Sequence, residues 1–206
     1  MRKKVLLVVS VALLSVAYVN AQFKFGARAG VNFTTIYGSD ADESKFKPGL
    51  QIGAVGDYAL NDALSIQPGI LLAQQGWQYK EGKAKMRINL NYIQVPINVQ
   101  YKMDLGGPNL LLNAGPYLGF GVNGKTKMWD DDGKKVDLDK DQSKIEFGSG
   151  AGKLNALDLG LGLGAGLQFD NIQVGLGVNF GLAKLNENSK MMNTGIALTA
   201  TYFFGN

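Results

Sequence analysis

The chain has 206 residues, with 21 lysines and arginines against 17 acidic residues, and it contains neither cysteine nor histidine. Three of the basic residues lie in the first four positions, so the rest of the chain is almost neutral and gives no case for a nucleic-acid partner. Without cysteine there are no disulfides, and without histidine the commonest general base and most zinc and haem sites are excluded.

The first 21 residues have the organisation of a secretory signal peptide. A basic start precedes an apolar run at residues 5–16, and the small-residue motif Val19-Asn20-Ala21 follows as a cleavage site. No later stretch reaches the roughly 18–20 apolar residues that a spanning helix needs. We therefore expect residues 1–21 to be a cleavable signal peptide and residues 22–206 to form one exported barrel domain.

Apolar residues alternate with glycine or polar residues in eight successive segments. Residues 160–169 show this most clearly, with the sequence GLGLGAGLQF. A period of two places the larger residues on one face of a strand and glycine or glutamine on the other. The expected strands span residues 23–34, 48–60, 64–77, 86–103, 109–123, 155–169, 172–183 and 192–204. Each is longer than the roughly 9–11 residues that cross a bilayer at a tilt.

The connections alternate between short turns and longer, more charged loops. The short turns are residues 61–63, 104–108 and 170–171, and the long loops are residues 36–47, 78–85, 125–153 and 184–190. Short turns at one rim and long loops at the other are typical of outer-membrane barrels. With an even number of strands, both termini then lie on the short-turn side, in the periplasm.

These observations predict an all-β fold, an eight-stranded antiparallel up-and-down transmembrane β-barrel of the outer-membrane type. A soluble lipocalin-like barrel also alternates, but its apolar face turns inward around a ligand. Glycines would then be exposed on strands, where they weaken a sheet. Facing a lumen, they leave room for larger side chains such as Arg28, Tyr92 and Tyr117. We therefore expect the leucine-and-aromatic face to meet lipid in a Gram-negative outer membrane.

Three segments resemble one protein family. Residues 91–101, NYIQVPINVQY, are similar to a recurrent strand of the PorT-like outer-membrane β-barrel family of the Bacteroidota. Residues 25–32, FGARAGVN, are similar to the family's first strand, and residues 115–119, GPYLG, extend the match. The resemblance implies that most of residues 22–206 belong to this family. A minority of its members are similar to components of the gliding and type IX secretion machinery, so the resemblance also allows a place in an envelope secretion assembly.

The residue types needed for catalysis are mostly missing. No Ser-His-Asp or Cys-His arrangement can be built without histidine and cysteine. The glycine repeats do not form a nucleotide-binding motif, because Ala165 and Phe180 stand where G-x-G-x-x-G needs its third glycine. We expect a protein that is not an enzyme and has no cofactor.

One acidic segment is a candidate metal site. Asp137, Asp139 and Asp141 alternate like the first three ligands of a calcium loop. The glycine that such a loop requires is replaced by Gln142, and its bidentate glutamate by Gly148. Because the surrounding residues carry equal numbers of lysines and acids, a solvated mixed-charge loop is the competing interpretation.

Five charged residues fall on the expected inner face, namely Lys24, Arg28, Asp57, Lys102 and Asp158. Because buried charges must be paired, we expect a lumen charge network in which Arg28 and Asp57 pair across adjacent strands. An eight-stranded barrel is barely wide enough to hold its own side chains, so we expect no stable conductance.

The expected function is that of a monomeric, non-enzymatic outer-membrane protein with a structural or surface-interaction role. Loops on a rigid scaffold are where binding normally resides, so residues 125–153 are the principal candidate. The expected partners are outer-membrane lipid, lipopolysaccharide and the barrel insertion machinery. Two alternatives stay open: a subunit of a secretion assembly contacted through the short turns, and a binder of a small apolar ligand or a divalent ion.

Overall fold

In the computed structural model, the described residues are 23–148, 150, 152–186 and 189–204, so the predicted signal peptide lies outside them. These residues form an all-β fold with one short helix. Its elements are β1 (Phe23–Tyr37), β2 (Lys45–Ala59), β3 (Leu64–Gln75), β4 (Trp77–Glu81), β5 (Ala84–Asp104), β6 (Asn109–Trp129), β7 (Lys135–Val136), α2 (Lys140–Ser143), β8 (Lys144–Ile145), β9 (Leu157–Phe169), β10 (Ile172–Gly181) and β11 (Met192–Phe204). Within the described part of the chain, no helix is long and apolar enough to span a membrane.

Eight of the eleven described strands pair in a closed antiparallel ring. The order around the ring is β1, β2, β3, β5, β6, β9, β10 and β11, and β11 pairs with β1 again. Closure leaves no open edge along the ring. The predicted antiparallel barrel is therefore confirmed, but three further strands accompany its ring of eight: β4 continues β3 beyond Gly76, and β7 and β8 pair with the far end of β6.

The observed strand bounds agree best with the predicted bounds next to the short turns and differ from them next to the long loops. The prediction of a loop at residues 78–85 is wrong, because β4 and β5 form a hairpin there, with Gly82 in its turn at a φ of 56°. The predicted loop 125–153 is shorter than expected, since β6 continues to Trp129. The charged residues of these segments are typical of loops, yet a strand whose outer face meets water accommodates them.

The two faces of the barrel are distributed as the alternation predicts. Leu161 and Leu163 on β9 are 50% and 54% exposed, and large apolar side chains of the other ring strands are exposed on the same outer surface. Gln51, Gln67 and Gln100 are buried inside the ring. Aromatic residues near the short turns are exposed as well: Phe25, Tyr58, Tyr101, Phe169, Tyr202 and Phe204. An apolar exterior around a polar interior is the arrangement of an outer-membrane barrel.

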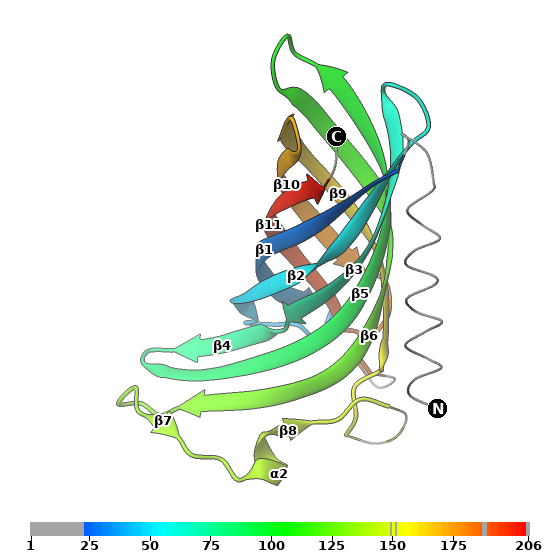
Figure 1. Ribbon diagram of the computed structural model, residues 1–206. Helices are drawn as coiled ribbons and strands as arrows, with labels where there is room; N and C mark the ends of the chain where they lie inside the picture. Colours follow the sequence, from blue (N-terminus) through cyan, green and yellow to red (C-terminus); the bar gives the residue numbers. More distant parts are fainter. Residues whose placement is uncertain (1–22, 149, 151, 187–188, 205–206) are drawn as a thin grey trace, which may run out of the picture.

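The two ends of the barrel differ strongly. The hairpins β2–β3, β5–β6 and β9–β10 lie at the same end as the C-terminal end of β11 (Figure 1). β4, the adjoining end of β5, the far end of β6 and the segment with β7, α2 and β8 lie at the opposite end (Figure 1). We call these the short-turn end and the long-loop end.

Candidate functional site

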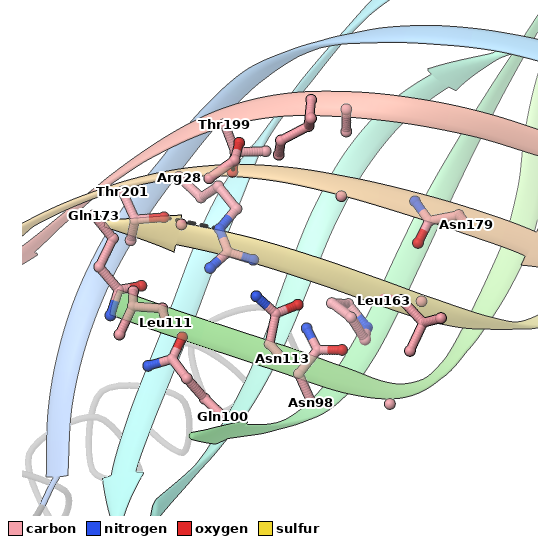
Figure 2. A pocket seen from close by; sticks show the side chains of 18 of the residues that line it. Arg28, Asn98, Gln100, Leu111, Asn113, Leu163, Gln173, Asn179, Thr199 and Thr201 are labelled. Atoms are coloured by element: carbon pink, nitrogen blue, oxygen red, sulfur yellow. Dashed lines mark hydrogen bonds between the residues drawn. The ribbon is translucent and has the colours of Figure 1, made fainter. Parts of the chain in front are cut away.

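The middle of the lumen is organised around Arg28. Its Nε donates a hydrogen bond to Thr201 Oγ1 at 2.8 Å (Figure 2). Its guanidinium also donates a hydrogen bond to Gln67 Oε1. Beside it lies a cavity of about 90 Å³, lined largely by amide and hydroxyl side chains such as those of Asn98 and Asn113. Sites for small molecules usually measure roughly 300–1,000 Å³ and are mostly apolar. The mid-lumen cavity therefore does not support the alternative of a small apolar ligand.

The predicted direct pair between Arg28 and Asp57 is not formed. The register of β1 and β2 sets Arg28 opposite Gly53. Asp57 lies four residues further along β2, so its backbone is roughly 13 Å from that of Gly53 at 3.3 Å per residue. Asp57 Oδ1 instead accepts hydrogen bonds from Ser65 Oγ at 2.8 Å and from Gln67 Nε2 at 3.4 Å. Gln67 therefore connects the two charges, with its carbonyl toward the guanidinium and its amide nitrogen toward the carboxylate.

The other predicted lumen charges are spread along the barrel. Lys24, Asp57 and Lys102 line a cavity of about 90 Å³ at the short-turn end. Asp158 is 2% exposed and belongs to a separate group, in which its Oδ2 accepts hydrogen bonds from Tyr117 at 3.3 Å and from Asn193 Nδ2 at 3.1 Å. Among the described residues, ion pairs are confined to positions 132–153, outside the lumen. Amides and hydroxyls, rather than cations, therefore donate to Asp57 and to Asp158 Oδ2, whereas Asp158 Oδ1 is buried without a hydrogen-bond partner among the described residues.

Apolar side chains close the long-loop end of the lumen. A buried cluster there is formed by Ile36, Trp77, Ile88, Leu90, Tyr92 and Leu185. Phe147, from the segment between β8 and β9, packs edge-on against Tyr92, with 5.4 Å between the ring centroids. Gly121 makes this possible, because a Cβ atom at that position would overlap the Phe147 ring. The prediction of no stable conductance is untested, and planar-bilayer recordings would test it.

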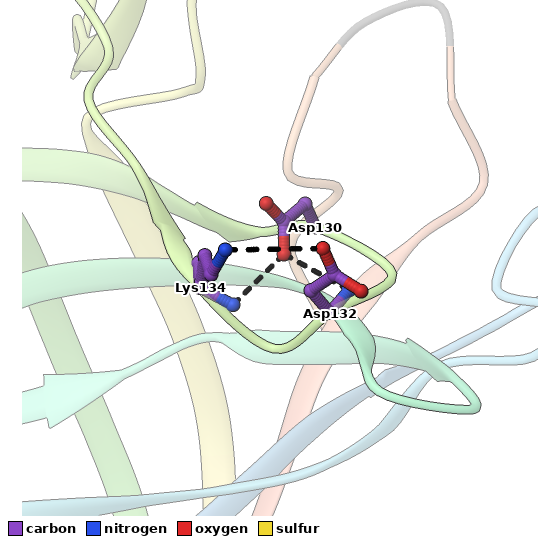
Figure 3. A network of polar contacts seen from close by, with 3 residues as sticks. All are labelled: Asp130, Asp132 and Lys134. Atoms are coloured by element: carbon purple, nitrogen blue, oxygen red, sulfur yellow. Dashed lines mark hydrogen bonds and ion pairs between the residues drawn. The ribbon is translucent and has the colours of Figure 1, made fainter.

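The acidic run after β6 forms a hairpin turn. Asp130 Oδ1 accepts hydrogen bonds from the backbone N–H groups of Asp132, at 3.0 Å, and Lys134, at 2.8 Å (Figure 3). The Nζ of Lys134 also lies 4.0 Å from Asp132 Oδ2 (Figure 3). These contacts, together with a φ of 80° at Gly133, join β6 to β7. The Asp130 carboxylate therefore stabilises a turn.

The calcium-loop candidate is not assembled into a site. Asp137, Asp139 and Asp141 are exposed, the first two before α2 and the third in its first turn. Over the described ranges, no three acidic side chains come close enough to hold a metal ion. The alternative of a divalent ion in this segment gains no support.

A basic sheet surface at the long-loop end was missed by the sequence analysis. β4 and the neighbouring ends of β5 and β6 extend past the ring (Figure 1). Their outer side carries Lys80, Lys85, Arg87, Lys125 and Lys127, which we call the basic face. The signal was present, since Lys85 and Arg87 alternate with apolar residues just as leucines alternate with glycines elsewhere. Charged residues are also typical of loops, and this competing signal hides the alternation.

Comparison with known proteins agrees with this geometry. Residues 19–187 match the family model described as an outer membrane protein beta-barrel domain. The chain belongs to this family. It is thus an outer-membrane β-barrel protein of the Gram-negative type, which confirms the predicted location. The narrower resemblance to PorT-like barrels is untested and stays a prediction.

Solved structures similar to this outer-membrane barrel include three bacterial proteins. Neisserial surface protein A is 14% identical, with a TM-score of 0.47, and the match covers 86% of this chain and 96% of that chain. The attachment invasion locus protein Ail of Yersinia pestis is 16% identical, with a TM-score of 0.45 and coverage of 89% and 99%. OprG of Pseudomonas aeruginosa is 13% identical, with a TM-score of 0.39 and coverage of 90% and 97%. No curated protein sequence matches the chain.

Proposed function

We propose that this outer-membrane barrel is a non-enzymatic protein that presents its long-loop end at the cell surface as an interaction surface. The observation that carries the proposal is the asymmetry of the two ends, since among the described residues the additional strands and the helix lie at the long-loop end alone. Loops positioned by a rigid scaffold are where binding sites concentrate. In this orientation both termini lie in the periplasm.

The outer surface supports a monomer surrounded by lipid. Exposed apolar side chains occur on every strand of the ring, as illustrated by Phe33 on β1, Leu72 on β3 and Leu198 on β11. A ring apolar on all sides needs lipid around it rather than one protein partner. We propose that outer-membrane lipid and lipopolysaccharide surround the barrel, and that the barrel insertion machinery places it there.

The role in a secretion assembly stays a prediction of the PorT-like resemblance. It requires periplasmic partners to bind the short turns. The turns at residues 60–63, 105–108 and 170–171 are exposed but have at most four residues each. The long-loop end offers a much larger surface, so we favour the surface-interaction role.

Cysteine labelling of intact cells tests the proposed orientation, because the natural chain contains no cysteine. The Asp131→Cys variant places a thiol in the exposed turn between β6 and β7, and the matched Asp62→Cys variant places one in a short turn. A membrane-impermeant maleimide is expected to label Asp131→Cys on intact cells. Asp62→Cys should react only after the outer membrane is permeabilised. The opposite pattern would reject the orientation.

A further inference from the structure

The basic face contains like charges directly opposite one another. Lys80 is the cross-strand partner of Lys85, and Arg87 is the partner of Lys127. Lys125 lies two residues from Lys127, on the same side of β6. Like charges in directly opposed positions destabilise an antiparallel pair. Two such pairs in one small sheet therefore need a compensating interaction.

Acidic side chains of the sheet do not provide that compensation. Residues 77–81, 84–92 and 121–129 contain a single acid, Glu81. Glu81 is paired with Ala84, and alternation places it on the other side of the sheet from Lys80 and Lys85. The ion pairs of the described residues use other lysines, at positions 134, 144 and 153. The positive charge of the basic face is thus left available for an anion from outside the chain.

Neighbouring side chains hold these cations in place. Lys85 Nζ lies 4.1 Å from the centroid of the Trp129 ring, and Arg87 Cζ lies 5.7 Å from it. Gln78 Oε1 accepts hydrogen bonds from Arg87 Nε at 3.4 Å and from its Nη2 at 3.3 Å. Gln78 occupies the Nε–Nη2 edge of the guanidinium, which leaves the Nη1–Nη2 edge to donate two parallel hydrogen bonds to a phosphate. This order reduces the entropy lost when an anion binds.

The opposite side of the sheet faces the barrel. Tyr79 and Met86 are cross-strand partners on that side and pack against the buried cluster at the long-loop end. Met128 is the partner of Met86 on β6. The sheet is therefore amphipathic, with an apolar side that covers the mouth of the barrel and a basic side that is free to meet a ligand.

The position of the basic face relative to the apolar exterior indicates the ligand. On β6, Phe120 and Val122 are exposed on the lipid-facing surface, and Lys125 and Lys127 follow on the outer side of the same strand. Five residues from Phe120 to Lys125 span roughly 17 Å. A molecule with acyl chains against the apolar band and phosphates above it would contact both surfaces at once.

We propose that the basic face binds the phosphate groups of outer-leaflet lipopolysaccharide. The proposal rests on the proposed function, because it requires the long-loop end to lie outside the cell. It goes further by naming the site, the residues and the chemical group that they recognise. A phosphorylated glycolipid supplies the anions that the opposed cations lack and the acyl chains that the adjoining band requires.

The test uses the full-length protein in nanodiscs and measures the binding of fluorescent lipopolysaccharide. Combined replacement Arg87→Gln, Lys125→Gln and Lys127→Gln removes three charges from the basic face. Combined replacement Lys134→Gln, Lys144→Gln and Lys153→Gln removes three charges that already have acidic partners. We expect the first variant to lose about tenfold in affinity and the second to stay within about twofold of the natural protein. Heat-dependent migration in electrophoresis checks that both variants are folded.

Two further arms identify the ligand. Dephosphorylated lipopolysaccharide should bind the natural protein about tenfold more weakly, and raised salt should reduce the difference. Equal binding of both glycolipids, or an unchanged affinity of the folded basic-face variant, would overturn the proposal. Inositol hexakisphosphate binding as tightly as lipopolysaccharide would instead indicate a soluble polyanion and would also overturn it. Nanodiscs expose both ends of the barrel, so this result is independent of the cysteine-labelling test of orientation.

Discussion

Gly160 on β9 shows how one small residue shapes the lumen. A Cβ atom there would overlap the Tyr117 ring and the backbone oxygen of Phe180. Tyr117 occupies that space and donates a hydrogen bond to Asp158. The alternation predicted that lumen glycines make room for larger residues, and this contact confirms it.

Replacing Gly160→Ala should therefore destabilise the barrel. A backbone oxygen cannot move aside as a side-chain end can, so we expect a loss of about 1–3 kcal/mol in the free energy of unfolding. Gly175→Ala is the matched control, because its Cβ would meet its nearest neighbour at an ordinary distance of 3.4 Å. Urea-induced unfolding in lipid vesicles measures the free energy of unfolding of both variants. Equal midpoints for the two variants would contradict the assignment of a steric role to Gly160.

The exposed cluster at Glu146 predicts a pH dependence. The hydrogen bond from Lys144, at 2.7 Å, and the contact of Lys153, at 3.3 Å, lower the pKa of the Glu146 carboxyl, and the same bond raises the pKa of Lys144. Because the pKa of Glu146 is lower in the folded state, this glutamate stabilises the fold at pH values above its unfolded pKa. That stabilisation is lost as the pH falls through the folded pKa. The lysine's contribution is lost as pH rises through its own raised pKa.

NMR titration of the Glu146 carboxyl tests this arrangement. Its midpoint should lie below that of an ordinary glutamate and should return toward it in Lys144→Gln. Because the side chains are exposed, high salt should have a similar effect. A midpoint that does not respond to Lys144→Gln would show that the pair is not formed in solution.

Residue-level pairing in the lumen is what the sequence leaves undetermined. Alternation correctly places Arg28, Gln67 and Asp57 on the inner face. Alternation does not give the register between neighbouring strands, and the register decides which side chains are cross-strand neighbours. Asp57 is four residues out of register with Arg28, so the predicted pair does not form and Gln67 lies between the two charges.

The segment between β6 and β9 combines exposed and buried parts. Its first half holds the hairpin with β7 and helix α2, whereas Ile145, Phe147 and Leu154 pack against the buried cluster at the mouth. Apolar residues dispersed among twelve charged residues carry no clear period, so the sequence indicates only a solvated loop. The structure shows that part of this loop closes the barrel.

Replacing Phe147→Ala should weaken that closure. The ring packs against Tyr92 and is half-buried, so we expect a loss of about 1–3 kcal/mol in unfolding free energy. Val136→Ala, at an exposed position of β7 in the same segment, should have little effect. Denaturant titration of both variants in the same lipid measures the two losses of stability. A neutral Phe147→Ala would mean that the segment does not rest on the mouth.

At the scale of the whole molecule, a period of two was enough to predict the fold. Eight alternating segments with short turns at one end give a ring of eight strands, and the lipid-facing side follows from which residues are large and apolar. The extensions of β4, β5 and β6 were missed because the apolar side of those strands faces the mouth and the outer side carries charge. The same period was present there with lysine and arginine in place of leucine.

The account depends on which side of the ring meets hydrocarbon, and a spin-label scan along β10 measures this directly. Single cysteines replace Val174, Gly175, Leu176, Gly177 and Val178 in turn, and oxygen accessibility is measured in lipid vesicles. Oxygen concentrates in acyl chains, so we predict maxima at Val174, Leu176 and Val178 and minima at the two glycines, which line the lumen cavity. Maxima at Gly175 and Gly177 instead would show that the apolar face turns inward and would contradict the proposed barrel orientation.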